Sequence, residues 1–68
     1  MDTNFKNIME HIVVSIQTAG HKPYDQLYGY LKTGNAAYIT RTGNARNIIK
    51  NLDCEQLKQY VDMLSHTR

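Results

Sequence analysis

The sequence predicts an all-α fold, a compact bundle of four to five short helices in a single domain over residues 1–68. Along four segments, apolar residues recur at intervals of three and four, which is the spacing of one helical face. Residues that favour helix caps stand at the ends of these segments. The chain nowhere shows the sustained alternation of apolar and polar residues that is typical of a half-buried strand.

The first predicted helix runs from about Asn4 to Ala19. Gly20 follows it, where a left-handed C-terminal cap belongs. The residues ahead of the helix, Met1 to Asn4, are expected to form a short tail. The apolar face of this helix consists of Phe5, Ile8, Met9, Ile12, Val13 and Ile16.

The second predicted helix begins at Pro23, since proline suits the first turn of a helix, and ends at Thr33 and Gly34. Its apolar face consists of Tyr24, Leu27, Tyr28 and Leu31. Gly29 lies inside this helix, where glycine costs about 1 kcal/mol relative to alanine. We therefore expect another backbone to approach the helix closely at Gly29.

The remaining chain is expected to hold a short turn and two further helices. Asn35 is expected to cap the turn, helical or irregular, over Ala36 to Ile39, and Thr40 to Gly43 is expected to be loop. Asn44 and Asp53 are expected to cap the two helices. Their apolar faces consist of Ala45, Ile48, Ile49 and Leu52 in one and Leu57, Tyr60, Val61 and Leu64 in the other.

A chain of 68 residues buries a small core, roughly 60% of the surface that the unfolded chain exposes. Domains of this size often depend on disulfides, a metal or self-association. The single cysteine, Cys54, excludes an internal disulfide and points to a reducing, cytoplasmic setting. Val14 and Tyr30 lie outside the predicted core faces and are candidate contacts of a homodimer, with a monomer as the alternative.

No pattern typical of an active site or a metal site occurs. His11, His21 and His66 lack the short spacing of zinc ligands. Cys54 is flanked by two acidic residues, which oppose a reactive thiolate. No glycine-rich phosphate-binding motif is present, and no apolar run is long enough to cross a membrane. The sequence therefore predicts a protein without catalytic activity, cofactor or membrane insertion.

The segment from residue 26 to residue 52 contains basic but no acidic residues. Arg46 and Lys50 are four residues apart, so they share a helical face. Together with Arg41 and Asn44 they are candidate contacts for an anionic or phosphorylated partner. Alternatively, the two arginines pair with an aspartate, Asp25 or Asp53, and lock the turn. Nucleic acid is a less favoured partner, because four basic residues without a reading motif are thin support.

An ordered series of short motifs lies between residues 20 and 47. They are Pro23-Tyr24-Asp25-Gln26-Leu27-Tyr28-Gly29-Tyr30-Leu31, Thr33-Gly34-Asn35-Ala36-Ala37-Tyr38-Ile39, and Arg41 followed by Asn44-Ala45-Arg46-Asn47. The first motif resembles the proline, asparagine or aspartate, glutamine, glycine–tyrosine pattern of the IreB family. The second resembles that family's serine–glycine–aspartate–proline–alanine–tyrosine–isoleucine segment. The third resembles its arginine and its alanine–arginine–asparagine signature. The positions expected to be structural in this motif are Pro23, Gln26, Gly29, Tyr30, Gly34, Tyr38, Ala45 and Asn47.

The resemblance covers about Ile8 to Leu64 and implies a function. IreB-like proteins are small, helical, cytoplasmic regulators of Gram-positive bacteria that form homodimers. They are linked to a transmembrane Ser/Thr kinase, to cell-envelope stress and to antibiotic resistance. The resemblance thus implies three partners: a second copy, a kinase and an unknown downstream protein.

The sequence departs from the family pattern in two places. It therefore resembles a divergent or N-terminally shortened member of that family. The family's phosphorylated threonine lies in an N-terminal tail, and Thr3 is the one candidate here, with simple helix capping as the alternative. The second departure is Ala36, where the family has proline. Alanine leaves this turn less rigid but still possible.

Overall fold

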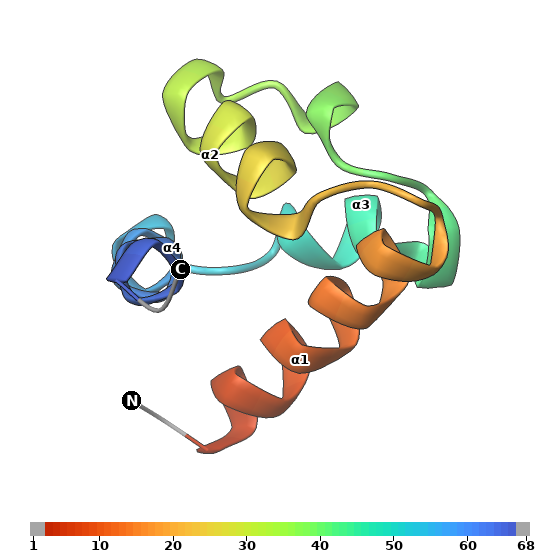
Figure 1. The fold of residues 1–68 in the computed structure, drawn as a ribbon. Coiled ribbons are helices and arrows are strands. Elements are labelled where there is room, and N and C mark those ends of the chain that lie inside the picture. Colours follow the sequence, from red (N-terminus) through yellow and green to blue (C-terminus); the bar gives the residue numbers. More distant parts are fainter. Residues whose placement is uncertain (1–2, 67–68) are drawn as a thin grey trace.

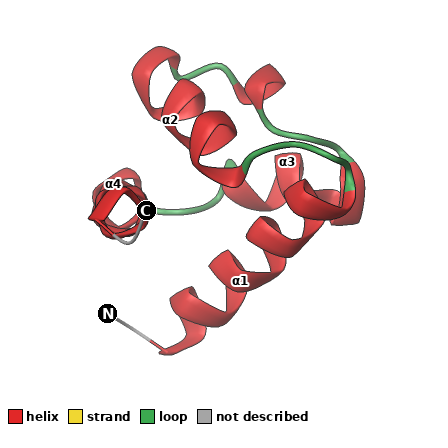
Figure 2. Ribbon diagram, viewed as in Figure 1, coloured by secondary structure: helices red, strands yellow, loops and turns green. Residues whose placement is uncertain are grey.

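The structure, a computed structural model, describes residues 3–66, which form four α-helices and two short 3₁₀ turns and contain no strand (Figures 1 and 2). The elements are α1 (Thr3–Thr18), α2 (Pro23–Thr33), η1 (Ala36–Tyr38), η2 (Thr42–Asn44), α3 (Ala45–Ile49) and α4 (Cys54–His66). The all-α prediction is confirmed for these residues. None of their helices combines the length and the apolar character needed to cross a bilayer.

The helices enclose one core in a nearly isometric particle of 25 × 23 × 22 Å. Helix α1 packs against α2, α3 and η2, while α2 also packs against α4 and η1 (Figure 1). The short α3 therefore lies against α1, and α4 lies against α2. This arrangement gives α2 and α4 one shared surface and brings η2 and α3 together at a second.

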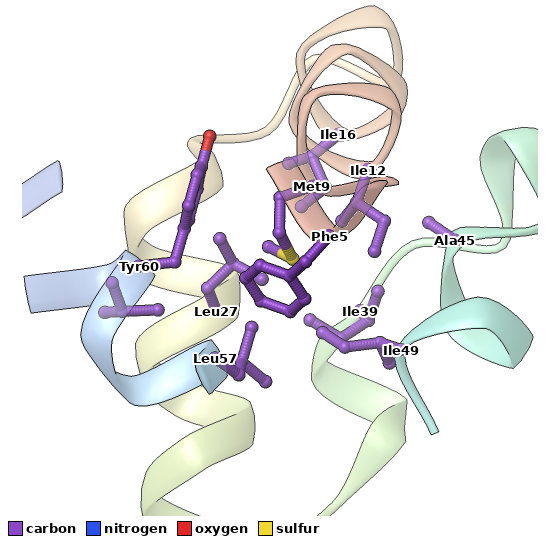
Figure 3. Packing of buried hydrophobic residues seen from close by; sticks show 11 residues of the cluster. Phe5, Met9, Ile12, Ile16, Leu27, Ile39, Ala45, Ile49, Leu57 and Tyr60 are labelled. Atoms are coloured by element: carbon purple, nitrogen blue, oxygen red, sulfur yellow. The ribbon is translucent and has the colours of Figure 1, made fainter. Parts of the chain in front are cut away.

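Every α-helix contributes side chains to the core, and Ile39 contributes one from the segment after η1 (Figure 3). Its buried apolar residues are Phe5, Met9, Ile12, Ile16, Leu27, Ile39, Ala45, Ile49, Leu57, Tyr60 and Val61. The Phe5 and Tyr60 rings meet edge to face at 6.4 Å, which joins the first turn of α1 to α4. Burial raises the pKa of the Tyr60 hydroxyl, and the Glu10 carboxylate adds to the rise.

Left-handed glycines end the first two helices, as predicted for Gly20, and the second helix ends at Gly34 as expected. Gly20 has φ +84°, and its N–H donates to the Gln17 carbonyl at 2.9 Å, while the His21 N–H donates to Ile16 at 3.1 Å. These two bonds form a Schellman motif. Helix α2 begins at Pro23 and ends at Gly34, which has φ +71°.

The predicted caps are confirmed at two positions and wrong at a third. Asn35 Oδ1 accepts the Ala37 N–H at 3.0 Å, and Asp53 Oδ1 accepts the Glu55 N–H at 3.1 Å. Asn44 makes no side-chain capping hydrogen bond. A capping side chain reaches the helix N–H groups from an extended backbone. Asn44 instead has a left-handed backbone, with φ +63°.

Three predicted boundaries also differ from the structure. Helix α1 starts at Thr3, one residue ahead of the predicted start at about Asn4, so Thr3 also is helical rather than part of the expected tail, and residues 1 and 2 lie outside the described part. Helix α3 ends at Ile49, because the chain then tightens into i−3 hydrogen bonds such as that from the Leu52 N–H to the Ile49 carbonyl, 3.2 Å. Part of the predicted loop, from Thr42, forms the 3₁₀ turn η2.

The close approach expected at Gly29 is made by a side chain rather than by another backbone. An ideal Cβ on Gly29 would lie 2.7 Å from Cδ1 of Tyr38. The Tyr38 ring, carried by η1, thus occupies the space that a larger residue on α2 would need. Tyr38 remains 48% exposed, so the contact lies at the surface of the protein.

Candidate functional site: a basic hollow beside α3

Four of the residues singled out in the basic segment line one hollow of about 450 Å³. The lining residues are Arg41, Asn44, Arg46, Asn47 and Lys50. We call this site the basic hollow. Asn47 also lines the hollow. The pattern of charged residues did not predict it as part of this site, although it belongs to the family motif. It joins the site through its side chain, whose Nδ2 donates to Asn44 Oδ1 at 2.8 Å.

Two successive left-handed residues shape the hollow. Gly43 has φ +61° and Asn44 has φ +63°, and the Asn44 N–H donates to the Arg41 carbonyl at 3.1 Å. Left-handed backbone is open to glycine without strain and is tolerated by asparagine better than by most residues. The sharp turn that follows brings Arg41 to the same side of the chain as the residues of α3.

Helix α1 holds this turn in place. The Gly43 carbonyl accepts a hydrogen bond from His11 Nε2 at 2.8 Å, so the proton is on that ring nitrogen. Ser15 Oγ donates to the His11 carbonyl at 2.8 Å. Gly43 packs so closely on Ser15 that a Cβ would collide with its hydroxyl. Sequence reasoning missed both His11 and Ser15, because no local pattern connects them with a turn that is distant in sequence, 32 residues after His11.

Arg46 has a structural contact as well as a place in the hollow. It is half-buried, and its Nε donates to the Ile39 carbonyl at 2.9 Å. The sequence suggested a carboxylate as the partner that locks the turn, and a backbone carbonyl takes that role for Arg46. A guanidinium carries several N–H donors in a planar fork, so this bond leaves donors for a ligand.

The electrostatics of the basic hollow favour an anion. Among its lining residues are three cations and no carboxylate. Arg41 and Lys50 are exposed, as are both asparagines. Like charges held together repel one another, and a bound phosphate or carboxylate relieves that repulsion while accepting hydrogen bonds from arginine and amide groups.

The other candidate residues lie apart from the hollow. Thr3 is exposed in the first turn of α1. It precedes His11 by eight residues, which is roughly 12 Å along a helix. Val14 is 57% exposed on α1. Tyr30 is partly buried and packs against the core, so only part of its ring is available to a second copy.

Several motif residues connect the chain between α2 and α3. Gln26 Oε1 accepts the Thr40 N–H at 3.0 Å, which ties α2 to the segment before η2. Ala45 is fully buried at the start of α3. Together with the contact of Tyr38 on Gly29, these residues support the segment that carries the hollow.

The described residues thus define a small all-α protein with a polar, positively charged hollow and, within residues 3–66, no group of three side chains suited to hold a metal ion. The chain belongs to the IreB family: the family model described as IreB regulatory phosphoprotein matches residues 1–63. This membership gives the protein a regulatory role.

Proposed function

We propose that the protein is a non-enzymatic regulator that acts through protein–protein contacts, with residues 1–68 as a single domain and the basic hollow as its partner surface. The lining of that hollow carries the proposal, since three cations without a carboxylate lie beside a turn that is anchored to α1, Arg41 ahead of the turn and Arg46 and Lys50 in and after α3. Family membership supports the cellular setting that we propose, the cytoplasm of a Gram-positive bacterium. There the protein regulates the response to cell-envelope stress and antibiotics.

The test uses a strain of the native host that lacks this protein. The variant R41E/K50E reverses two exposed charges of the hollow and leaves Arg46 with its Ile39 contact. We expect the wild type to restore the parental antibiotic susceptibility and R41E/K50E to fail at equal protein abundance. K6E is the matched control, because Lys6 is exposed on α1 and does not line the hollow. Full restoration by R41E/K50E would refute the assignment.

Thr3 is the proposed phosphorylation site. It is exposed, and the first turn of α1 contains no acidic residue. A phosphate there would add about −1.5 to −2 charge at the positive end of the helix dipole, which is favourable. Incubation with the host's transmembrane Ser/Thr kinase and ATP should add one phosphate, which mass spectrometry locates on Thr3 and which T3A lacks. An unmodified wild-type protein would remove this part of the proposal.

A second candidate function is direct binding of a phosphorylated or nucleic-acid ligand in the same hollow. The convergence of Arg41, Arg46 and Lys50 favours it. Binding should weaken steeply with added salt, because it rests on charge. Titration with a phosphothreonine peptide, inorganic phosphate and a short RNA should shift the amide NMR signals of residues 41–50, and less so in R41E/K50E. Unshifted signals with all three ligands would dismiss it.

The protein is also proposed to act as a homodimer. Its core is small, and several large apolar side chains remain exposed. They are Val14, Tyr28, Tyr38 and Met63. Pairing would cover part of this surface, which small domains often need. Light scattering of the wild type at high micromolar concentration tests the dimer, and a strict monomer would contradict it.

A further inference from the structure

A groove of about 440 Å³ runs between α2 and α4 and shares no lining residue with the basic hollow. Each helix lines it with one face, because the lining residues recur at intervals of three and four. They are Tyr24, Tyr28, Leu31 and Lys32 from α2 and Cys54, Glu55, Lys58, Val61 and Asp62 from α4. We call this surface the α2–α4 groove.

The apolar part of the α2–α4 groove has an aromatic wall. The Tyr24 and Tyr28 rings stack with centroids 5.9 Å apart and an interplanar angle of 18°. Tyr28 is nevertheless 49% exposed, while Val61 is buried at 4% and Leu31 is half-buried. A preorganised, half-exposed tyrosine beside an apolar floor has the composition that protein interfaces favour.

The charges of the groove decide which partner fits it. Lys32 and Lys58 balance Glu55 and Asp62, so the charged lining is neutral overall. On α4 the signs alternate along the face, from Glu55 through Lys58 to Asp62. In a two-fold dimer the same patch occurs on both copies, so it has to be complementary to itself. A balanced patch satisfies this condition, whereas the basic hollow would face a second set of cations.

From this complementarity we infer that the α2–α4 groove is the surface through which two copies of the chain pair. The inference rests on the proposed homodimer and adds where its interface lies. In the pair, Tyr28 of each copy enters the partner's groove, and the lysines of one copy face the acidic residues of the other. The basic hollows stay on the outside of the dimer, open to a different partner.

Complementary charge reversal tests this inference in the full chain. The variant E55K/D62K makes the groove wholly positive, and K32E/K58E makes it wholly negative. Sedimentation equilibrium should show that each variant alone has a dimer dissociation constant about tenfold or more above the wild type, because like charges then face one another. An equimolar mixture should recover the wild-type affinity, and native mass spectrometry should find the mixed dimer in excess over either homodimer.

Two further variants keep the test decisive if charge reversal unfolds α4, which circular dichroism would reveal. Tyr28→Ser removes the exposed ring without changing the charge and should also weaken the dimer about tenfold, as a central aromatic contact does. Val14→Asp is the matched control on α1, exposed to a similar degree, and should leave the dimer intact.

The outcomes distinguish the location of the interface in the α2–α4 groove from the existence of the dimer. A wild type that stays monomeric overturns both the proposed homodimer and the groove inference. A dimeric wild type that is unaffected by Tyr28→Ser and by charge reversal overturns the groove alone. Dissociation by Val14→Asp instead would assign the interface to α1.

Discussion

The basic hollow and the α2–α4 groove have nearly the same volume, about 450 and 440 Å³, but opposite chemistry. The hollow is lined by cations and amides that come from ten consecutive residues, 41–50. The groove is lined by tyrosines, aliphatic side chains and balanced charges from two helices that are distant in sequence. Volume therefore says little about what either surface binds, and the sign and balance of the charges say more.

The two surfaces also differ in what holds them in shape. The groove follows from two regular helices packed side by side, so each residue's position is set by helical spacing. The hollow depends on a single left-handed turn, fixed by the bond from His11 to Gly43 and by the bond from Arg46 to Ile39. We expect the hollow to be sensitive to substitutions in the backbone turn and the groove to be insensitive to them.

The largest effect is expected from Gly43→Ala. Alanine at φ +61° is strained, and its Cβ would collide with the Ser15 hydroxyl. Together the two terms should lower the free energy of unfolding by about 3 kcal/mol. Urea denaturation measures it. Gly20→Ala is the matched control, since Gly20 also has a positive φ but no atom within 4 Å of the added Cβ, and it should cost only about 1 kcal/mol. Equal losses would mean that the contact with Ser15 contributes nothing.

This pair of glycines also shows how far the sequence could predict the fold. Gly20 follows an amphipathic helix, so its left-handed cap was predictable from the local pattern. The need for glycine at position 43 arises from Ser15 and His11, which are remote in sequence, and no local rule could anticipate it. The helices were predictable because each has a periodic apolar face, and their packing partners were not.

The candidate site was predictable to a similar extent. Charge and helical spacing selected Arg41, Arg46 and Lys50, because an acid-free segment is visible in the sequence. The α2–α4 groove was not foreseen, since its two faces lie in different helices and become neighbours only in the folded chain. The Asn44 cap was predicted wrongly, because residue type alone does not reveal a left-handed backbone.

An intermediate effect on stability is expected from Arg46→Ala. This substitution tests whether Arg46 stabilises the turn of the hollow, in contrast to Arg41, whose exposed side chain is available to a ligand. The lost bond to the Ile39 carbonyl should lower the free energy of unfolding by about 1.5 kcal/mol, because the side chain is half-buried and charged. Arg41→Ala, at an exposed position of the same hollow, should change it by less than about 0.5 kcal/mol. Thermal melts monitored by circular dichroism measure both. If Arg41→Ala proved the more costly, the division between a supporting and a binding arginine would be reversed.

The smallest effect is expected from Gly29→Ala, on the side of α2 that does not line the groove. Alanine should gain about 1 kcal/mol of helix propensity. Its Cβ, however, would displace the Tyr38 ring, which lies 2.7 Å away. The two terms should nearly cancel, leaving a change within about 0.5 kcal/mol, since single surface contacts have modest effects.

A double-mutant cycle with Tyr38→Ser resolves the two terms of the Gly29→Ala effect. Once the ring is absent, Gly29→Ala should stabilise the protein by the full ~1 kcal/mol of helix propensity. Urea denaturation of the four proteins gives the coupling free energy between the two positions. The same change in both backgrounds would mean that the ring exerts no constraint on Gly29. Because neither residue lines the α2–α4 groove, the dimer dissociation constant should stay at the wild-type value throughout the cycle, which separates the folding role of α2 from its proposed pairing role.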